Sequence, residues 1–319
     1  MSDHNPGPRV VVTPVFEDTE ASTRLFKELS LTLGEQLYVV AVDDGSVQQP
    51  VDIRHLEEAG VDGAVITLRR NVGHQRAIAV GLSYVADQLP DAQWVVVMDS
   101  DGEDVPASIL QLIRPLASGD VDVVVAERKS RVETLKFRSF YLVYKWLFLA
   151  LTGRRISFGN FMALKPAALK RLVAMQELWI HVAACVLTSK LRVEKCALDR
   201  GPRFAGQSKM NFVGLALHGF RGLMVFAEDV LVRVGMACAV IAALSIFGGA
   251  AAILLKILNF ATPGWFSVAL GILLLVFLQT GTLTLMTLML TGVVKGSIVA
   301  SVDYKAFISR VRSTGDSAA

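Results

Sequence analysis

Two long stretches without a charged residue constrain the fold of this chain more than any other feature. Residues 234–255 and 257–294 contain no Asp, Glu, Lys or Arg. Because about 20 apolar helical residues cross the ~30 Å hydrocarbon core of a bilayer, each stretch predicts a membrane-spanning helix. A turn-forming segment at 259–264 separates them, so we expect the second helix at 265–290. The alternative, two core helices of a soluble protein, fits poorly with a chain that is 53% hydrophobic.

The basic residues around these stretches predict an orientation. They flank both stretches at Arg221, Arg233, Lys295, Lys305, Arg310 and Arg312, whereas only Lys256 lies near the turn. By the positive-inside rule both flanks lie in the cytoplasm. We therefore predict an integral protein of the inner (cell) membrane, with both termini and the large N-terminal part cytoplasmic. Three widely spaced cysteines fit a reducing compartment, and a net charge of +3 gives no indication of nucleic acid binding.

The N-terminal part alternates strand and helix patterns. Apolar runs of strand type lie at 9–15, 37–42, 64–68, 94–98 and 121–126, with helical patterns at 19–33, 51–59, 74–89 and 107–116. This alternation predicts a parallel, doubly wound α/β sheet. Polar or glycine residues follow the runs, at the sheet edge where such folds bind ligands. Neither G-x-G-x-x-G after the first run nor G-x-x-x-x-G-K-[ST] occurs, which disfavours a dinucleotide dehydrogenase and a P-loop NTPase.

Acidic residues follow the fourth strand-type run. Asp99, Asp101 and Glu103 come directly after the apolar residues 94–98, and Pro106 then opens a helical pattern. Carboxylates two residues apart at a strand end reach one cation when the backbone turns, and hard oxygen ligands suit Mg²⁺ or Mn²⁺ shared with substrate phosphates. The alternative for an isolated Asp-x-Asp is a polar, capped loop.

Two segments outside the uncharged stretches are predicted to be amphipathic helices on the cytoplasmic face of the bilayer. Residues 132–151 are apolar and aromatic but carry three basic residues; an ordinary core helix is the alternative. Residues 211–232 are similar, with Arg221 and Arg233 as candidate headgroup contacts. The tail beyond Ser313 is expected to be disordered.

Five motifs resemble those of family 2 glycosyltransferases of the GT-A fold. They are V-T-P-V-F-E-D at 12–18, V-D-D-G-S at 42–46, N-V-G-H-Q-R-A at 71–77, D-S-D at 99–101 and R-G-P-R-F-A-G-Q-S-K-M at 200–210. The last, with a two-helix C-terminal hairpin, resembles the dolichol-phosphate mannose synthase-like subgroup, which glycosylates polyprenyl phosphates. The resemblance covers roughly residues 10–294. It implies a Rossmann-like GT-A catalytic domain with juxtamembrane amphipathic helices and two transmembrane helices.

The resemblance also implies roles for individual residues. The residues expected to bind the donor are Pro14, Val15, Asp18, Asp43, Asp44, Gly73, Asp99, Ser100, Asp101, Arg128 and Arg200. Those expected to bind the acceptor phosphate are Arg200, Arg203, Ser208 and Lys209. Metal binding is expected of Asp99, Asp101 and Glu103, and catalysis of Asp99, Asp101 and Arg203. The divalent ion offsets the charge of the departing diphosphate. Residues 43–46 also fit a simple turn, and any one of the arginines a solvated surface charge. We expect His74 to start a helix or line the pocket, not to bind metal.

The chain departs from the family pattern at two positions. Glu103 stands where the family usually has Gln, and is either a third metal ligand or a modifier of metal preference. Asn160 stands where an acidic residue is frequent, so a base at that position is not expected. A phosphate monoester needs no base, since its second pKa of about 6 leaves it mostly ionised near pH 7; a sugar hydroxyl acceptor needs one.

We therefore predict a cytoplasmic GT-A domain at 1–210, a juxtamembrane amphipathic helix at 211–233, a transmembrane hairpin at 234–294 and a cytoplasmic tail at 295–319. The predicted reaction is inverting transfer of one sugar from a nucleotide diphosphate sugar to polyprenyl phosphate, by a homo-oligomer, a tetramer by resemblance. The alternatives are a processive polysaccharide synthase, a transferase acting on another lipid, and a non-catalytic nucleotide-sugar-binding membrane protein. The synthase is disfavoured because Q-E-L-W at 176–179 lacks the Arg-Trp pair of the Q-x-x-R-W motif.

Overall fold

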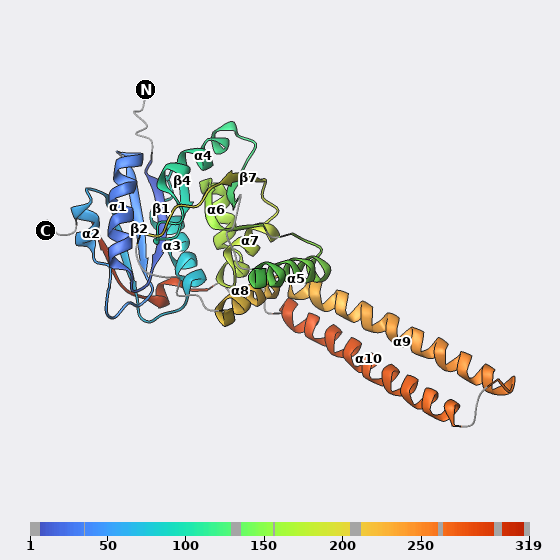
Figure 1. Cartoon of the computed structure of the whole chain (residues 1–319). Coiled ribbons are helices and arrows are strands. Elements are labelled where there is room, and N and C mark those ends of the chain that lie inside the picture. Colours follow the sequence, from blue (N-terminus) through green and yellow to red (C-terminus); the bar gives the residue numbers. More distant parts are fainter. Residues whose placement is uncertain are drawn as a thin grey trace. The chain divides into compact units, whose positions relative to one another are not determined.

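The computed structural model describes residues 7–34, 36–128, 135–155, 157–204, 212–260, 264–296 and 302–315 (Figure 1). The chain divides into two compact units. The first, named the sheet unit, comprises residues 1–138, 156–225 and 301–319. The second, named the hairpin unit, comprises residues 139–155 and 226–300.

The sheet unit contains an eight-stranded sheet in the order β7-β5-β6-β4-β1-β2-β3-β8. Its strands are β1 (Arg9–Val15), β2 (Leu37–Asp43), β3 (Asp62–Leu68), β4 (Trp94–Val97), β5 (Val123–Arg128), β6 (Phe158–Leu164), β7 (Val193–Leu198) and β8 (Ile308–Ser313). β1 pairs in parallel with β2 and β4, as do β2 with β3 and β5 with β7. β6 lies antiparallel between β4 and β5, and β8 is antiparallel to β3. The predicted α/β fold is confirmed, and its sheet is mixed rather than wholly parallel.

Helices cover both faces of this sheet because its central strands are apolar on both sides. Val10 and Val12 of β1 pack on one face with Ile78 and Leu82, and Val11 packs on the other face in a second core. Helices α3, α6 and α7 contribute to the first core, and α1, α2 and α4 to the second; Figure 1 shows α1 and α2 on one side and α6 and α7 on the other. Two apolar faces produce the three-layer arrangement that the alternating sequence pattern predicts.

The helices of the sheet unit follow the predicted pattern in most places. They are α1 (Thr19–Leu33), α2 (Ile53–Glu58), α3 (His74–Gln88), α4 (Ile109–Ile113), α6 (Pro166–Val173), α7 (Val182–Thr188) and α8 (Phe212–Met224). The helix predicted at 107–116 is instead α4 between two 3₁₀ turns, at Pro106–Ser108 and Pro115–Ser118. The predicted single helix at 211–233 is also wrong, because α8 stops at Met224 and a new helix begins at Ala227.

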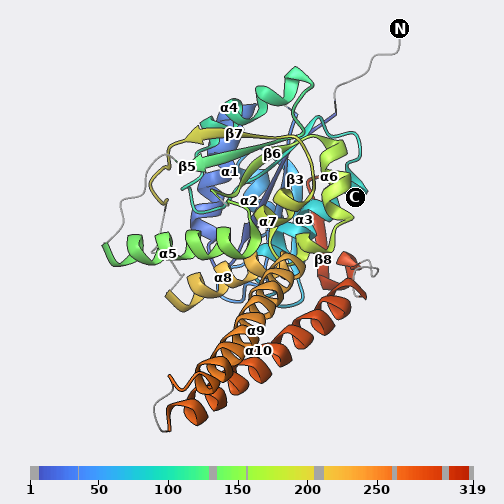
Figure 2. The same ribbon diagram turned by 90° about the vertical axis from the view of Figure 1, so that its right-hand side faces the viewer.

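The C-terminal segment is not simply a tail. Strand β8 pairs antiparallel with β3, on the edge of the sheet away from β2 (Figure 2). Tyr304 donates its hydroxyl to Asp87 at 2.7 Å, and Arg312 forms an ion pair with Asp52 at 2.9 Å. The residues on either side of the uncharged stretches, up to 225 and from 302, therefore belong to one sheet unit.

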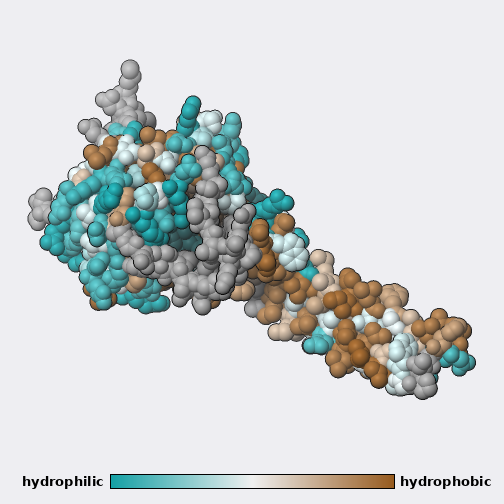
Figure 3. Space-filling view, viewed as in Figure 1, coloured by the Kyte–Doolittle hydropathy of each residue, from teal (hydrophilic) through white to brown (hydrophobic). Residues whose placement is uncertain are grey.

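The hairpin unit consists mainly of two long antiparallel helices, α9 (Ala227–Ile257) and α10 (Trp265–Gly296). Both are long and apolar enough to cross a membrane, and most of their large apolar side chains are exposed (Figure 3). Small residues allow close approach: a Cβ on Gly235 would lie 2.7 Å from Thr287, and one on Gly248 3.2 Å from Leu273. Helix α5 (Leu135–Thr152) exposes Trp146 and other apolar side chains and buries Phe148; its amphipathic placement on the bilayer surface stays a prediction.

Candidate active site

The acidic residues after β4 form a compact loop, named the carboxylate loop, at residues 99–104. The backbone turns so that the Asp99 N–H donates to Asp104 Oδ2 at 3.0 Å and the Glu103 N–H donates to Asp101 Oδ1 at 2.9 Å. Burial, together with the nearby Asp99 carboxylate, raises the pKa of Asp101. Four carboxylates within six residues make this edge of the sheet strongly negative, an environment that favours a cation.

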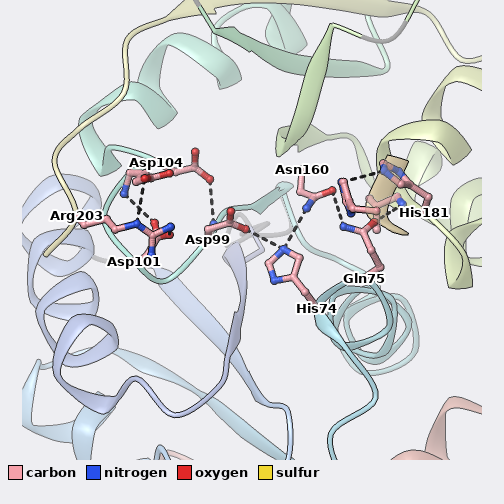
Figure 4. A network of polar contacts seen from close by, with 11 residues as sticks. His74, Gln75, Asp99, Asp101, Asp104, Asn160, His181 and Arg203 are labelled. Atoms are coloured by element: carbon pink, nitrogen blue, oxygen red, sulfur yellow. Dashed lines mark hydrogen bonds and ion pairs between the residues drawn. The ribbon is translucent and has the colours of Figure 1, made fainter. Parts of the chain in front are cut away.

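Two arginines from the segment after β7 pair with this loop, and Figure 4 shows one of them, Arg203, beside Asp101. Arg203 lies 2.8 Å from Asp101 Oδ2 and 3.1 Å from Glu103 Oε1, and Arg200 lies 2.6 Å from Glu103 Oε2. The backbone joins too, since the Phe204 N–H donates to the Asp101 carbonyl at 2.9 Å. The arginines predicted for phosphate binding thus lie at the carboxylate loop, where they balance its charge.

The donor set of this loop fits a cation held by a few carboxylates and completed by substrate. Among the described residues, no group of three or more His, Cys, Asp or Glu side chains is arranged as a metal cage. Mg²⁺ is commonly held by one or two carboxylates plus substrate phosphates, and Asp99 and Asp101 provide such a pair. Both oxygens of Glu103 face arginines, so its role as a third ligand stays a prediction.

Asp43 and Asp44, which were predicted to bind the donor, accept hydrogen bonds from the backbone of loops beside the site. Asp43 is fully buried and accepts backbone N–H groups from Ser46 at 2.7 Å and Val51 at 2.8 Å. Asp44 accepts those of Val72 at 2.7 Å and Gly73 at 2.9 Å. Burial raises the pKa of Asp44 despite these hydrogen bonds. Asp43 therefore forms the turn considered as the alternative, and Asp44 connects the end of β2 to the N-V-G loop.

The remaining predicted donor residues lie around the same edge. Pro14 and Val15 end β1, where the Val15 carbonyl accepts the Asp44 N–H at 2.8 Å. Asp18 is the N-cap residue of α1 but makes no side-chain cap hydrogen bond. Ser100 is buried in the carboxylate loop. The Arg128 side chain, Ser208 and Lys209 lie outside the described residues.

Glu17, for which no role was predicted, holds the neighbouring loop. Its carboxylate accepts the backbone N–H groups of Val47 at 2.6 Å, Gln48 at 3.0 Å and Gln49 at 2.7 Å. Its own φ is +47°, a left-handed conformation that is uncommon outside glycine. The two acidic residues at 17–18 in the first motif were the sequence signal for this contact. The sequence does not say which of the two carboxylates faces residues 47–49, because that depends on the fold.

His74 is the first residue of α3, which confirms the predicted helix start, and its side chain contacts Asp99. Its Nε2 is 3.1 Å from Asp99 Oδ1 and 3.1 Å from the side-chain amide of Asn160. Burial lowers the pKa of His74, but the Asp99 and Asp101 carboxylates outweigh that effect and raise it. The path continues from Asn160 to Gln75 at 3.2 Å, and Gln75 accepts the N–H of Val182 at 2.7 Å (Figure 4). The position of His74 after the N-V-G motif, at the same sheet edge as the carboxylate loop, was the signal for this contact.

Comparison with known proteins identifies the family. Residues 10–173, more than half of the chain, match the model of glycosyl transferase family 2. The chain belongs to this family. The glycosyltransferase is 25% identical over 253 residues to the undecaprenyl-phosphate 4-deoxy-4-formamido-L-arabinose transferase of Edwardsiella ictaluri, covering 76% of this chain and 72% of that one. It is 27% identical over 149 residues to the transferase of the same name from Salmonella paratyphi B, covering 45% and 44%.

Solved structures support the fold of this glycosyltransferase. Glucosyl-3-phosphoglycerate synthase from Mycobacterium tuberculosis, in complex with Mg²⁺ and uridine diphosphate, matches with a TM-score of 0.51 at 15% identity, covering 70% of this chain and 79% of that one. The same enzyme with Mn²⁺, UDP-glucose and phosphoglyceric acid gives a TM-score of 0.51 at 17% identity, covering 71% and 79%. At these identities the likeness shows the GT-A fold alone.

Proposed function

We propose that this glycosyltransferase moves one sugar from a nucleotide diphosphate sugar to a polyprenyl phosphate, with inversion at the anomeric carbon. The observation that carries the proposal is the carboxylate loop with its two arginines at the carboxyl edge of the central strands. The acceptor class is supported by the Edwardsiella relative, named an undecaprenyl-phosphate transferase, because that similarity extends over 253 residues, beyond the 10–173 family match.

The reaction needs an ionised phosphate oxygen and a stabilised leaving group. A phosphate oxygen of the acceptor attacks the anomeric carbon, and the bond from that carbon to the donor's β-phosphate oxygen breaks. The electron pair leaves with the nucleoside diphosphate. No proton is removed from a dianionic phosphate monoester, so Asn160 in place of an acid is compatible with this acceptor.

Asp99 and Asp101 would hold the divalent ion, Mg²⁺ or Mn²⁺, which when bound offsets the charge of the departing diphosphate. Arg203 lies 2.8 Å from one oxygen of Asp101. Asp101 would share its carboxylate between this guanidinium and the divalent ion, so Arg203 would be available to the donor diphosphate when the ion is held. A guanidinium matches phosphate oxygens well.

The chain connectivity supports one topology. The residues before α9 and those that form β8 belong to the same sheet unit, so if α9 and α10 each cross a membrane, both flanks lie on one side. With basic residues concentrated in those flanks, we place the sheet unit and both termini in the cytoplasm at the inner membrane. The tetramer stays a prediction from resemblance.

A transfer assay tests the proposal. The purified full-length protein in vesicles receives undecaprenyl phosphate, Mg²⁺ or Mn²⁺, and each of a panel of radiolabelled nucleotide sugars. We expect label in an organic-extractable lipid with at least one donor, and none with Asp99→Asn. Transfer of label only to a water-soluble acceptor or to polymer would assign the protein to another class.

A further inference from the structure

Helix α8 brings two polar side chains to the edge of the active site. His218 and Arg221 are three residues apart and therefore neighbours on the helix surface. A Cβ built on Gly73 would lie 4.0 Å from Arg221 Nη1, and the next residue, His74, is 3.1 Å from Asp99. Figure 4 shows Asp99 with Asp101 and Arg203 on one side and His74 on the other. Arg221 thus lies by the His74 side of the carboxylate loop, whereas Arg203 lies on the other side.

Arg221 is an exposed cation without an acidic partner in the described part of the chain. Arg200 and Arg203 are both held by carboxylates, but no ion pair links Arg221 to a described acidic residue. Burial lowers the pKa of both His181 and His218, and the positive charge of Arg221 lowers both further. The guanidinium of Arg221 therefore lies beside Gly73, whose N–H donates to Asp44, and it forms no ion pair with a described carboxylate.

Within the described residues, the hydrogen-bond directions leave one ring nitrogen of His218 as a donor without an acceptor. His181 caps α7, and its Nδ1 accepts the Ala184 N–H at 3.2 Å. In the neutral ring the hydrogen is consequently on Nε2, which lies 3.2 Å from His218 Nε2. His218 Nε2 then accepts, and the hydrogen of its neutral ring is on Nδ1. This tautomer is assigned from the network, and it leaves His218 with an N–H donor three residues from Arg221.

An exposed apolar stripe runs along α8 next to these polar groups. Leu217, Phe220 and Met224 are spaced by three and four residues, so they share one face, and each is more than half exposed. Arg221 lies between this stripe and His218 around the helix. A cation bordering an exposed apolar stripe suits an amphiphile with an anionic head and an apolar tail.

On the basis of the proposed function, we propose that Arg221 and His218 bind the phosphate monoester of the polyprenyl phosphate acceptor. Arg221 donates from its guanidinium and His218 from Nδ1 to phosphate oxygens, and the apolar stripe of α8 lies along the start of the tail. Arg200 and Arg203, on the other side of Asp99, then serve the carboxylate loop and the donor diphosphate. The acceptor and donor phosphates are held by different cations, which keeps the two anions apart until the sugar is transferred.

The test measures acceptor and donor kinetics separately, with the full-length protein in vesicles of zwitterionic lipid. Arg221→Ala should raise the KM for undecaprenyl phosphate about ten- to hundredfold, the loss of a charged hydrogen bond, and leave the KM for the nucleotide sugar within about twofold. Arg171→Ala removes an exposed arginine of α6 and is the matched control. His218→Gln keeps an acceptor for His181 and a donor for phosphate, so it should retain a low acceptor KM, whereas His218→Phe should not.

A binding measurement distinguishes this proposal from the function on which it rests. ³¹P NMR of undecaprenyl phosphate in the same vesicles, without donor or metal, should show a shift with the wild-type protein and none with Arg221→Ala. An Arg221→Ala effect that appears only in vesicles of anionic lipid would mean that Arg221 contacts headgroups, and overturns the proposal. Unchanged acceptor KM and ³¹P shift in Arg221→Ala overturn it as well. Failure of sugar transfer with an intact ³¹P shift would refute the proposed reaction and not the phosphate site.

Discussion

The contact between Gly102 and Phe204 gives a direct test of how the carboxylate loop is held. Gly102 has φ +86°, and a Cβ there would lie 2.5–2.6 Å from three atoms of the Phe204 ring. Gly102→Ala therefore forces the ring, and with it Arg203, away from the loop. Gly119 has the same φ of +86° with nothing within 4 Å of a built Cβ. Gly119→Ala consequently carries the same kind of backbone strain, roughly 1–2 kcal/mol, without the collision.

The free-energy cost of this collision follows from the contacts that Phe204 and Arg203 lose. Phe204 is partly buried, so its displacement forfeits about half of the 1.5–3 kcal/mol of a fully buried apolar side chain. The partly exposed ion pairs of Arg203 add about 0.2–1 kcal/mol. The total of about 1–2.5 kcal/mol corresponds to a roughly 5- to 70-fold change in a local opening equilibrium.

Hydrogen exchange of the full-length protein measures that equilibrium. The Gly201 N–H donates to the Glu103 carbonyl and the Phe204 N–H to the Asp101 carbonyl, at 3.0 and 2.9 Å. Gly102→Ala should lower the protection of both amides by roughly 5- to 70-fold, and Gly119→Ala should leave it unchanged. Adding Phe204→Ala to Gly102→Ala should remove the extra cost, since no ring remains to collide. Equal protection in Gly102→Ala and Gly119→Ala would refute the reasoning.

Three further predictions concern the metal, the arginine and pH. Asp99→Asn or Asp101→Asn should abolish transfer with unchanged thermal unfolding, because each removes charge from a site outside the core; full activity of either with Mg²⁺ or Mn²⁺ contradicts the assignment. Arg203→Ala should lower the rate of transfer more than tenfold. The affinity for Mn²⁺ without donor, measured by EPR, should be unchanged or higher, because Asp101 loses the guanidinium that competes with the metal. A lower Mn²⁺ affinity would contradict that competition. Burial, and after it the charges of His218 and Arg221, lower the pKa of His181 to about 3. Between pH 3 and 6.5 the unfolded chain therefore binds more protons than the folded chain, and the free energy of unfolding falls as the pH decreases. The expected loss is about 2 kcal/mol from pH 7 to 5 for this group, and His181→Asn should flatten the pH dependence of the unfolding temperature; an equally steep profile contradicts the sign.

Local sequence patterns predicted the parts of the fold that local patterns determine. Thr19–Leu33 forms as expected because apolar residues recur at helical spacing and Gly34, at φ +63°, follows its last turn. The carboxylate loop was predicted because acidic residues directly follow a buried strand. The break at 225–226 was missed, since the apolar pattern is continuous there and no Gly or Pro marks the end of α8.

Non-local pairing explains the rest. Strand β8 carries two arginines and two serines in I-S-R-V-R-S and is mostly exposed, so it lacks an apolar alternation strong enough to predict. It becomes a strand because β3, over 240 residues earlier, offers an open edge. Likewise the basic character of Arg203 was evident, but its partner Glu103 lies 100 residues away in sequence. The sequence therefore indicated a cation for a phosphate, whereas in the folded chain the nearest anions are protein carboxylates.

The mass of the lipid product tests the proposed reaction most directly. The wild-type protein in vesicles receives excess nucleotide sugar of the accepted kind, with undecaprenyl phosphate or with undecaprenol of the same length, and the extracted lipids are analysed by mass spectrometry. We predict one product, undecaprenyl phosphate plus a single sugar, at all reaction times. We predict no product from undecaprenol, because a hydroxyl acceptor needs a general base and the Asn160 amide is not one. A series of products with increasing numbers of sugars, or a glycosylated undecaprenol, would contradict single transfer to a phosphate acceptor.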